Sequence, residues 1–163
     1  MSEGDIAWDL EYVVDIAKNR LSPQFAPEPM GQAHSGKKAH YADTNYQLLG
    51  AIIEAVMERP LQEAFEELII GPLALSATYL HGHGQPLSPS QGAPASIYYG
   101  QMALYLDKAM RSFGPDGGMV SNVQDSLRFH RAIMEGDLFK DHSTLERMMN
   151  WKKIFFPMQY GLG

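Results

Sequence analysis

The chain has 163 residues, a net charge of −6 and no cysteine. This length suits one domain with a sizeable core, and the acidic balance without any basic cluster argues against a nucleic-acid partner. The lack of cysteine excludes disulfides and thiolate chemistry but leaves the compartment open between cytoplasm and periplasm. No apolar run approaches the roughly 20 residues of a membrane span, and the first residues lack the basic and apolar regions of a signal peptide.

Three helices are predicted in the first half of the chain. The first runs from Asp5 to Arg20 and is followed by an irregular loop over residues 21–39, which is rich in proline and glycine. The second spans about Thr44 to Glu58, with Thr44 or Asp43 expected to cap its first N–H groups. Its apolar residues repeat at helical spacing and predict one continuous buried stripe: Leu48, Leu49, Ile52, Ile53, Val56 and Met57.

The third helix is opened by Pro60 and ends at Gly71-Pro72. We expect its buried face to consist of Leu61, Ala64, Phe65, Leu68 and Ile69. The stretch that follows, residues 80–94, is rich in Gly, Pro, Ser and His and is predicted to be a second irregular loop.

In the second half, residues 96–106 are interpreted as an extended segment or a short helix, and residues 113–118 as a turn. Ser121 with Gln124, and Ser143 with Glu146, have the spacing of capping boxes. They predict helices that end at Gly136 and near residue 150, followed by an extended segment over 155–163. The pattern therefore indicates a single, mainly α domain over 1–163 with little strand of its own.

One motif resembles a known family. The run from Tyr41 to Tyr46, Tyr-Ala-Asp-Thr-Asn-Tyr, resembles the Tyr-x-Asn region of serine β-lactamases and DD-peptidases, most of all class C-like enzymes and related esterases. Further matches follow in order: Gly71-Pro72-Leu73, Thr78-Tyr79, residues 116–122 (Asp-Gly-Gly-Met-Val-Ser-Asn), Asp125 and Tyr160-Gly161-Leu162-Gly163. Asp43 departs from the family, which usually has Asn there, and a carboxylate offers no amide N–H to a substrate.

The resemblance implies roles for three residues. Tyr41 would be a general base, alone or with a lysine, that activates a serine nucleophile, and Asp43 and Asn45 would contact the substrate. A phenol has a pKa near about 10, so that it needs an adjacent cation to lose its proton near neutrality. The alternative is a packing tyrosine whose hydroxyl bonds a backbone group, and the surrounding motif favours descent from a catalytic residue.

The remaining catalytic motifs of the family are not found. The nucleophile should lie in a Ser-x-x-Lys far upstream of the tyrosine. Only Ser35-Gly36-Lys37-Lys38 has that spacing, and it lies six residues before Tyr41 in a polar stretch, so we interpret it as a chance match. The family's Lys-Thr-Gly or His-x-Gly is also absent, and Ser121 is assigned as a helix cap. The resemblance thus implies an inactive helical subdomain of a β-lactamase/transpeptidase-like fold, cut from a two-lobed enzyme.

That complete enzyme would hydrolyse an amide or ester, such as a β-lactam, a D-Ala peptide or an ester, through an acyl-enzyme. Its partner would be a small-molecule or peptide substrate, and the exposed lobe interface would favour self-association. Two alternatives stay open. One is a non-catalytic binding or scaffolding module; the other is a small metal-binding protein using His81 and His83 with His34 or His40. A solvated histidine loop is favoured over that second alternative, so neither metal nor cofactor is expected.

Overall fold

The computed structural model describes residues 5–21, 41–88, 93–155 and 157–161. The helical segments are α1 (Leu10–Asp15), η1 (Ile16–Arg20), α2 (Asp43–Met57), α3 (Leu61–Phe65), η3 (Glu66–Ile70), α4 (Asp107–Phe113), η5 (Gly114–Asp116), α5 (Val123–Glu135) and α6 (Ser143–Met148). The strands are β1 (Tyr79–Leu80), β2 (Ile97–Tyr99), β3 (Met102–Leu104), β4 (Met119–Val120), β5 (Lys152–Phe155) and β6 (Met158–Tyr160). They form three separate antiparallel pairs, β1–β4, β2–β3 and β5–β6.

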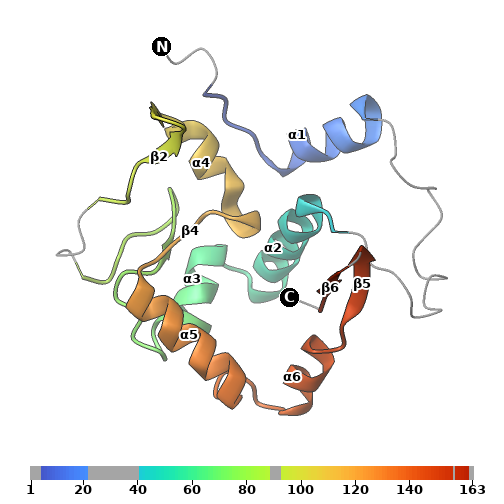
Figure 1. Cartoon of the computed structure of the whole chain (residues 1–163), viewed down its shortest axis with the longest axis vertical. Helices are drawn as coiled ribbons and strands as arrows, with labels where there is room; N and C mark the ends of the chain where they lie inside the picture. Colours follow the sequence, from blue (N-terminus) through green and yellow to red (C-terminus); the bar gives the residue numbers. More distant parts are fainter. Residues whose placement is uncertain (1–4, 22–40, 89–92, 156, 162–163) are drawn as a thin grey trace.

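The structure is therefore mainly helical, as predicted, with strands confined to short pairs (Figure 1). The extended interpretation of residues 96–106 is confirmed as the β2–β3 hairpin, and the extended C-terminal segment as β5–β6. Within the described ranges, no helix has the length and apolar character needed to cross a bilayer. Most of the loop predicted over 21–39, together with Ser35, lies outside the described residues.

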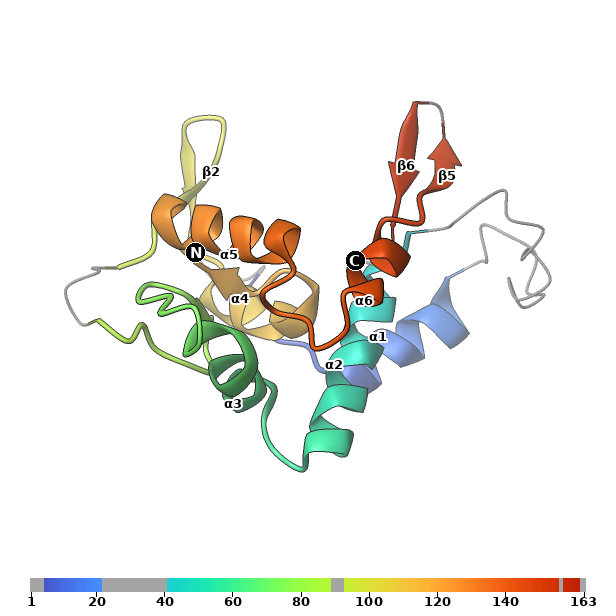
Figure 2. The same ribbon diagram turned by 90° about the horizontal axis from the view of Figure 1, so that it is seen from below.

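The elements separate into two diverging groups. Figure 2 shows α3, α4 and α5 on one side, and α1, α2, α6 and the β5–β6 hairpin on the other. The core lies mainly in the first group, where η3, the segment around Leu75, and α5 meet. Ile70 and Leu75 are the largest side chains that are fully buried among the described residues. This core is small for the length of the chain, so that many large apolar side chains remain on the surface.

The predicted burial of the α2 stripe is wrong. Leu48, Leu49, Ile52 and Val56 are 44%, 51%, 56% and 77% exposed, and the residues that α2 buries are Gln47 and Gly50. The helix docks against η5 with its small, polar face: a Cβ on Gly50 would lie 2.6 Å from Cγ of Pro115. Gln47 Nε2 also donates a hydrogen bond to the Phe113 carbonyl at 2.6 Å. Four of the six stripe residues are therefore left at the surface, and Ile53 and Met57 are half-buried.

Several predicted caps are also corrected. Ala42 occupies the N-cap of α2 and provides no side-chain bond, so that neither Thr44 nor Asp43 caps the helix. At α5 the cap is Asn122, whose Oδ1 accepts from the Asp125 N–H at 2.8 Å. Ser121 is not the cap, because its hydroxyl is engaged with Thr78 instead, at 2.8 Å. Similarly, Ser143 is the first residue of α6 rather than its cap. The predicted ends at Gly71 and Gly136 are confirmed.

The N-terminal segment begins its helix later than predicted. Asp9 caps α1, its Oδ1 accepting from the Tyr12 N–H at 2.8 Å. Asp5, expected inside this helix, instead accepts from the N–H groups of Lys108 and Ala109, at 3.0 and 2.8 Å. These are residues at the start of α4, a helix that the sequence did not predict. A side chain more than 100 positions away thus satisfies donors that the first turn of α4 leaves open.

Candidate active site

Tyr41 lies immediately before α2, at the surface, with about half of the residue exposed (51%). Its ring meets the ring of Tyr160 edge-on, with centroids 5.5 Å apart and an interplanar angle of 78°. The ring of Tyr46, one turn into α2, also contacts the Tyr41 ring, with centroids 5.7 Å apart. Tyr160 belongs to β6, so the fold brings the Tyr-Gly segment near the end of the chain to the first motif. The two matching regions therefore form one surface site.

The electrostatic surroundings of Tyr41 are acidic. A side-chain hydrogen bond with Asp43 raises the pKa of the Tyr41 hydroxyl above its ordinary value, and partial desolvation and the Asp43 charge raise it further. Tyr160 and Asp116 act in the same direction. No lysine or arginine of the described residues contributes to this balance. As the site stands, Tyr41 is held in its protonated form, which is the opposite of what a general base requires.

Asp116 is a member of this site that sequence reasoning missed. Residues 116–118 were interpreted as a turn, and η5 does place Asp116 at a bend beside α2. Partial burial raises the pKa of its carboxyl, the Gln47 hydrogen bond opposes that shift, and the Asp43 charge adds to it. Its Oδ1 is buried without a hydrogen-bond partner. The only signal in the sequence was the order of the Asp-Gly-Gly motif, since its distance to Asp43 depends on the fold.

Asp43 and Asn45 both lie in the first turn of α2 and are exposed. Asp43 is coupled to Tyr41, as described above. The backbone N–H of Asn45 donates to the Ala42 carbonyl at 3.0 Å, and its side chain is open to solvent. Both residues are thus reachable by a substrate at this surface, and their substrate contacts stay a prediction.

Replacing Asp43 by asparagine should lower the pKa of Tyr41. The substitution removes the negative charge and the carboxylate acceptor that stabilise the protonated phenol. The pKa of Tyr41 can be measured by following tyrosinate absorbance in the ultraviolet as the pH is raised. Adding Tyr41→Phe to the original chain and to Asp43→Asn identifies the part of each curve that belongs to Tyr41. Exposed Asp137 offers the matched control, since Asp137→Asn should leave the Tyr41 curve in place. An unchanged or raised pKa in Asp43→Asn would contradict this account of the site.

In the described part of the chain, the two histidines of the motif contact other groups. His81 Nε2 lies 3.5 Å from the Asp107 carboxylate, and His83 Nε2 lies 3.2 Å from the Arg111 carbonyl. Across the described residues, no group of three or more His, Cys, Asp and Glu could hold a metal ion. His34 and His40, the suggested further ligands, lie outside the described part of the chain.

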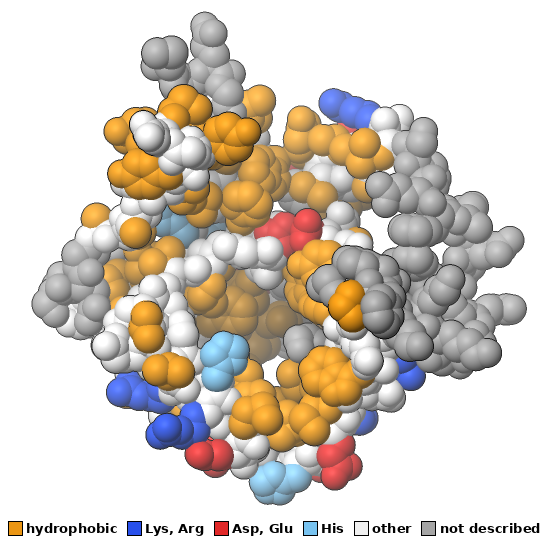
Figure 3. Space-filling view, viewed as in Figure 1, with side chains coloured by type: hydrophobic (Ala, Val, Ile, Leu, Met, Phe, Trp, Pro, Cys, Tyr) orange, Lys and Arg blue, Asp and Glu red, His pale blue; other side chains and the backbone are white. Residues whose placement is uncertain are grey.

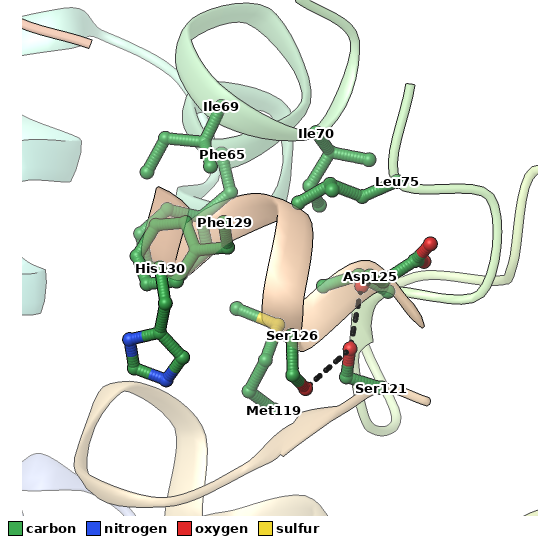
Figure 4. Close-up of a pocket in the computed structure, with 11 residues that line it drawn as sticks. Phe65, Ile69, Ile70, Leu75, Met119, Ser121, Asp125, Ser126, Phe129 and His130 are labelled. Atoms are coloured by element: carbon green, nitrogen blue, oxygen red, sulfur yellow. Dashed lines mark hydrogen bonds between the residues drawn. The ribbon is translucent and has the colours of Figure 1, made fainter. Parts of the chain in front are cut away.

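The cavity of Figure 4, about 280 Å³, lies at a different place, between η3 and α5. Asp125, which is 3% exposed, accepts hydrogen bonds from the Ala77 N–H at 2.7 Å and the Thr78 hydroxyl at 3.0 Å. Ser121 extends this chain, with its Oγ 3.5 Å from that of Ser126. The network ties the segment before β1 to the start of α5. Thr78 and Asp125, two of the residues that match the family, therefore have a structural role in this chain.

Comparison with known proteins supports the resemblance. The sequence model of the β-lactamase family matches residues 6–159. A protein of Escherichia coli O157:H7, named as a D-alanyl-D-alanine carboxypeptidase, is 28% identical over 127 residues, covering 65% of this chain and 29% of its own length.

Among solved structures, a D-stereospecific amidohydrolase from Streptomyces sp. is 28% identical with a TM-score of 0.71, over 96% of this chain and 44% of that one. A D-amino acid amidase from Ochrobactrum anthropi SV3 superposes with a TM-score of 0.73 at 23% identity, over 97% of this chain and 44% of its own. The octameric penicillin-binding protein homologue of Pyrococcus abyssi reaches 0.67 at 22% identity, over 99% of this chain and 36% of its own. The chain thus spans less than half the length of these relatives.

Proposed function

The chain belongs to the β-lactamase family, and from this we propose that it is the helical lobe of a serine hydrolase that cleaves an amide or ester through an acyl-enzyme. The observation that carries the proposal is the position of Tyr41. It is half exposed just before α2 and in ring contact with Tyr160, so its side chain is accessible from solvent. In this role Tyr41 takes the proton of an attacking serine.

Tyr41 needs help to do so. Its described neighbours are acidic and hold its proton, so the base becomes competent only when a cation is brought close. The missing part of the enzyme would supply both the nucleophilic serine and a lysine one turn after it, and that lysine would provide the charge. We therefore propose that residues 1–163 alone are inactive, and that Asp43 and Asn45 contribute polar contacts once the second half of the site is present.

For the substrate, we propose an amide or peptide bond next to a D-amino acid. The support is the naming of two relatives at 28% identity, a D-stereospecific amidohydrolase and a D-alanyl-D-alanine carboxypeptidase. A β-lactam or a simple ester remains within the same acyl-transfer chemistry. A non-catalytic module that kept this lobe is the alternative.

A chimera tests the proposal: residues 1–163 replace the matching segment of the Streptomyces amidohydrolase. The chimera should hydrolyse a D-amino acid amide, and Tyr41→Phe should lower kcat about 10²- to 10⁴-fold, as expected when a general base is removed. The isolated chain is the matched control and should turn over neither that amide, a chromogenic β-lactam nor a short-chain ester.

Three results would count against it. A folded chimera whose activity is unaffected by Tyr41→Phe would remove the catalytic role of Tyr41. Turnover by the isolated chain that Ser35→Ala abolishes would show that the Ser35 motif is a real nucleophile. A folded but inactive chimera would favour the non-catalytic module.

A further inference from the structure

A further cleft lies between the segment before α1, the middle of α2 and the helix α4. Its volume is about 510 Å³, within the range of roughly 300–1,000 Å³ that is usual for small-molecule sites. The hollow in the face shown in Figure 3 is surrounded mainly by hydrophobic side chains, whereas this cleft combines apolar with charged groups. Tyr41, Asp43, Asp116 and Tyr160 are not among its lining residues. The cleft is therefore distinct from the candidate active site.

Part of the lining is apolar and held in place. Leu61 and Leu80 line the cleft and are almost fully buried, at 4% and 2% exposure. Trp8 also lines it and is fixed at two points: its backbone N–H donates to Oγ of Ser112 at 2.9 Å, and its ring meets the Phe113 ring edge-on. An aliphatic or aromatic group that enters the cleft would therefore lose water against a preformed apolar surface.

Three basic residues come together on another part of the lining. Lys108 and Arg111 lie one turn apart on α4, and His83 Nε2 donates to the Arg111 carbonyl at 3.2 Å. The stem of Arg111 packs on Gly82, where a Cβ would lie 2.5 Å from its Cγ, and its Nε donates to Asp107 at 2.8 Å. Among the described residues, the terminal guanidinium nitrogens of Arg111 and the Lys108 ammonium group have no ion pair or hydrogen bond.

The two acidic residues of the lining already act as acceptors. Asp9 Oδ1 accepts from the Tyr12 N–H at 2.8 Å, and Glu54 Oε1 accepts from the Leu61 N–H at 2.9 Å. The cleft thus offers charged donors that lack acceptors, and an anion would complement them. The two carboxylates would repel a doubly charged phosphate more strongly than a singly charged group. A ligand with one negative charge fits this balance best.

We propose that this cleft binds a small monocarboxylate whose body is aliphatic or aromatic. The carboxylate contacts Arg111 and Lys108, because a guanidinium group can bind a carboxylate through two parallel hydrogen bonds. The apolar body lies against Trp8, Leu61 and Leu80. The inference goes beyond the proposed hydrolase activity, since no residue of the Tyr41 site takes part in it.

Three probes test the charge and the apolar body separately: 3-phenylpropionate, its isosteric amide 3-phenylpropanamide, and propionate. The chain has two tryptophans, Trp8 in the cleft and Trp151, which is 58% exposed and does not line it. Proton–nitrogen NMR follows both indole N–H signals during each titration, and Trp151→Phe assigns them. We expect 3-phenylpropionate to shift the Trp8 signal and to leave the Trp151 signal in place.

The affinities should rank the probes. The Kd of 3-phenylpropionate should be about three- to tenfold lower than that of the amide, as for a charge-assisted contact that is partly exposed to water. It should also be about tenfold lower than the Kd of propionate, which has the charge but lacks the phenyl group that leaves water.

Two variants remove the positive charges. Arg111→Gln and Lys108→Gln should each weaken 3-phenylpropionate about three- to tenfold and leave the affinity for the amide unchanged. Arg20→Gln is the matched control, because Arg20 forms an exposed ion pair with Asp15, as Arg111 does with Asp107, but does not line the cleft. This control should bind 3-phenylpropionate like the original chain, and circular dichroism would verify that all three variants fold.

A Trp8 signal that stays in place at saturating 3-phenylpropionate would overturn the site. Equal affinities for the acid and its amide would overturn the contact with a carboxylate, and so would an equal loss in Arg20→Gln and in the two cleft variants. Propionate that binds as tightly as 3-phenylpropionate would overturn the role of the apolar surface. All these readouts are binding to the isolated chain, whereas the chimera measures hydrolysis, so either proposal can fail while the other stands.

Discussion

Replacing Asp125 by alanine is expected to destabilise the chain by about 3–5 kcal/mol, as removal of one partner from a buried charged network does. The carboxylate is 3% exposed and accepts hydrogen bonds from the Ala77 N–H at 2.7 Å and the Thr78 hydroxyl at 3.0 Å. Alanine leaves both donors buried without an acceptor. A loss of this size is a large fraction of the about 5–15 kcal/mol that stabilises a typical domain, so the variant should unfold at a much lower urea concentration than the original chain.

Urea unfolding followed by circular dichroism measures this effect. The free energy of unfolding of Asp125→Asn should lie between those of Asp125→Ala and the original chain, because the amide keeps one oxygen as an acceptor but loses the charge. Asp137→Ala, the same substitution at an exposed position, should stay within about 0.5 kcal/mol. A stable Asp125→Ala chain would mean that water replaces the carboxylate, and that β1 and α5 are held together by other contacts.

A second large loss is expected for Ile70→Ala, about 2–5 kcal/mol, because Ile70 is 1% exposed at the centre of the small core. Leu49→Ala removes an aliphatic side chain of the same size, yet Leu49 is 51% exposed and its loss should cost far less. Tyr41→Phe should also have little effect, since the hydroxyl is at the surface. Thermal unfolding of the three variants side by side makes the comparison.

These variants test whether the α2 stripe is exposed, as in the structure, or buried, as the apolar spacing predicts. If Leu49→Ala lowered the melting temperature as much as Ile70→Ala, the α2 stripe would be buried in solution after all. A dependence of that loss on protein concentration would then identify self-association as the cause.

The helices were predictable where the sequence is locally decisive. Apolar spacing located α2, α3 and α5, and Gly71 and Gly136 marked ends correctly. Periodicity shows that a helix has an apolar face but does not show what covers it, and for this reason the burial of Leu48–Val56 was predicted wrongly. The cap of α5 was missed by one residue, since Ser121 and Asn122 are both good caps and the competition from Thr78 is a tertiary contact.

The candidate site was partly predictable for the same reason. Tyr41 and Asp43 belong to one short motif and could be read together. Tyr160 and Asp116 join them only because β6 and η5 fold back to the start of α2. The direction of the Tyr41 pKa shift follows from these distances, so a motif that names a base could not reveal that its described neighbours keep it protonated.

The contacts of Asp5 with the start of α4 bear on the order in which the chain folds. They close a loop of 103 positions, and Trp8 adds a backbone bond to Ser112 at 2.9 Å and an edge-on ring contact with Phe113 at 5.2 Å. Such distant closure carries a large entropic cost before any contact repays it. During synthesis Asp5 and Trp8 can make these contacts only after the residues of α4 have left the ribosome. Docking of the N-terminal segment should therefore be a late step, and the amides of Lys108 and Ala109 should gain protection from hydrogen exchange after those of α5.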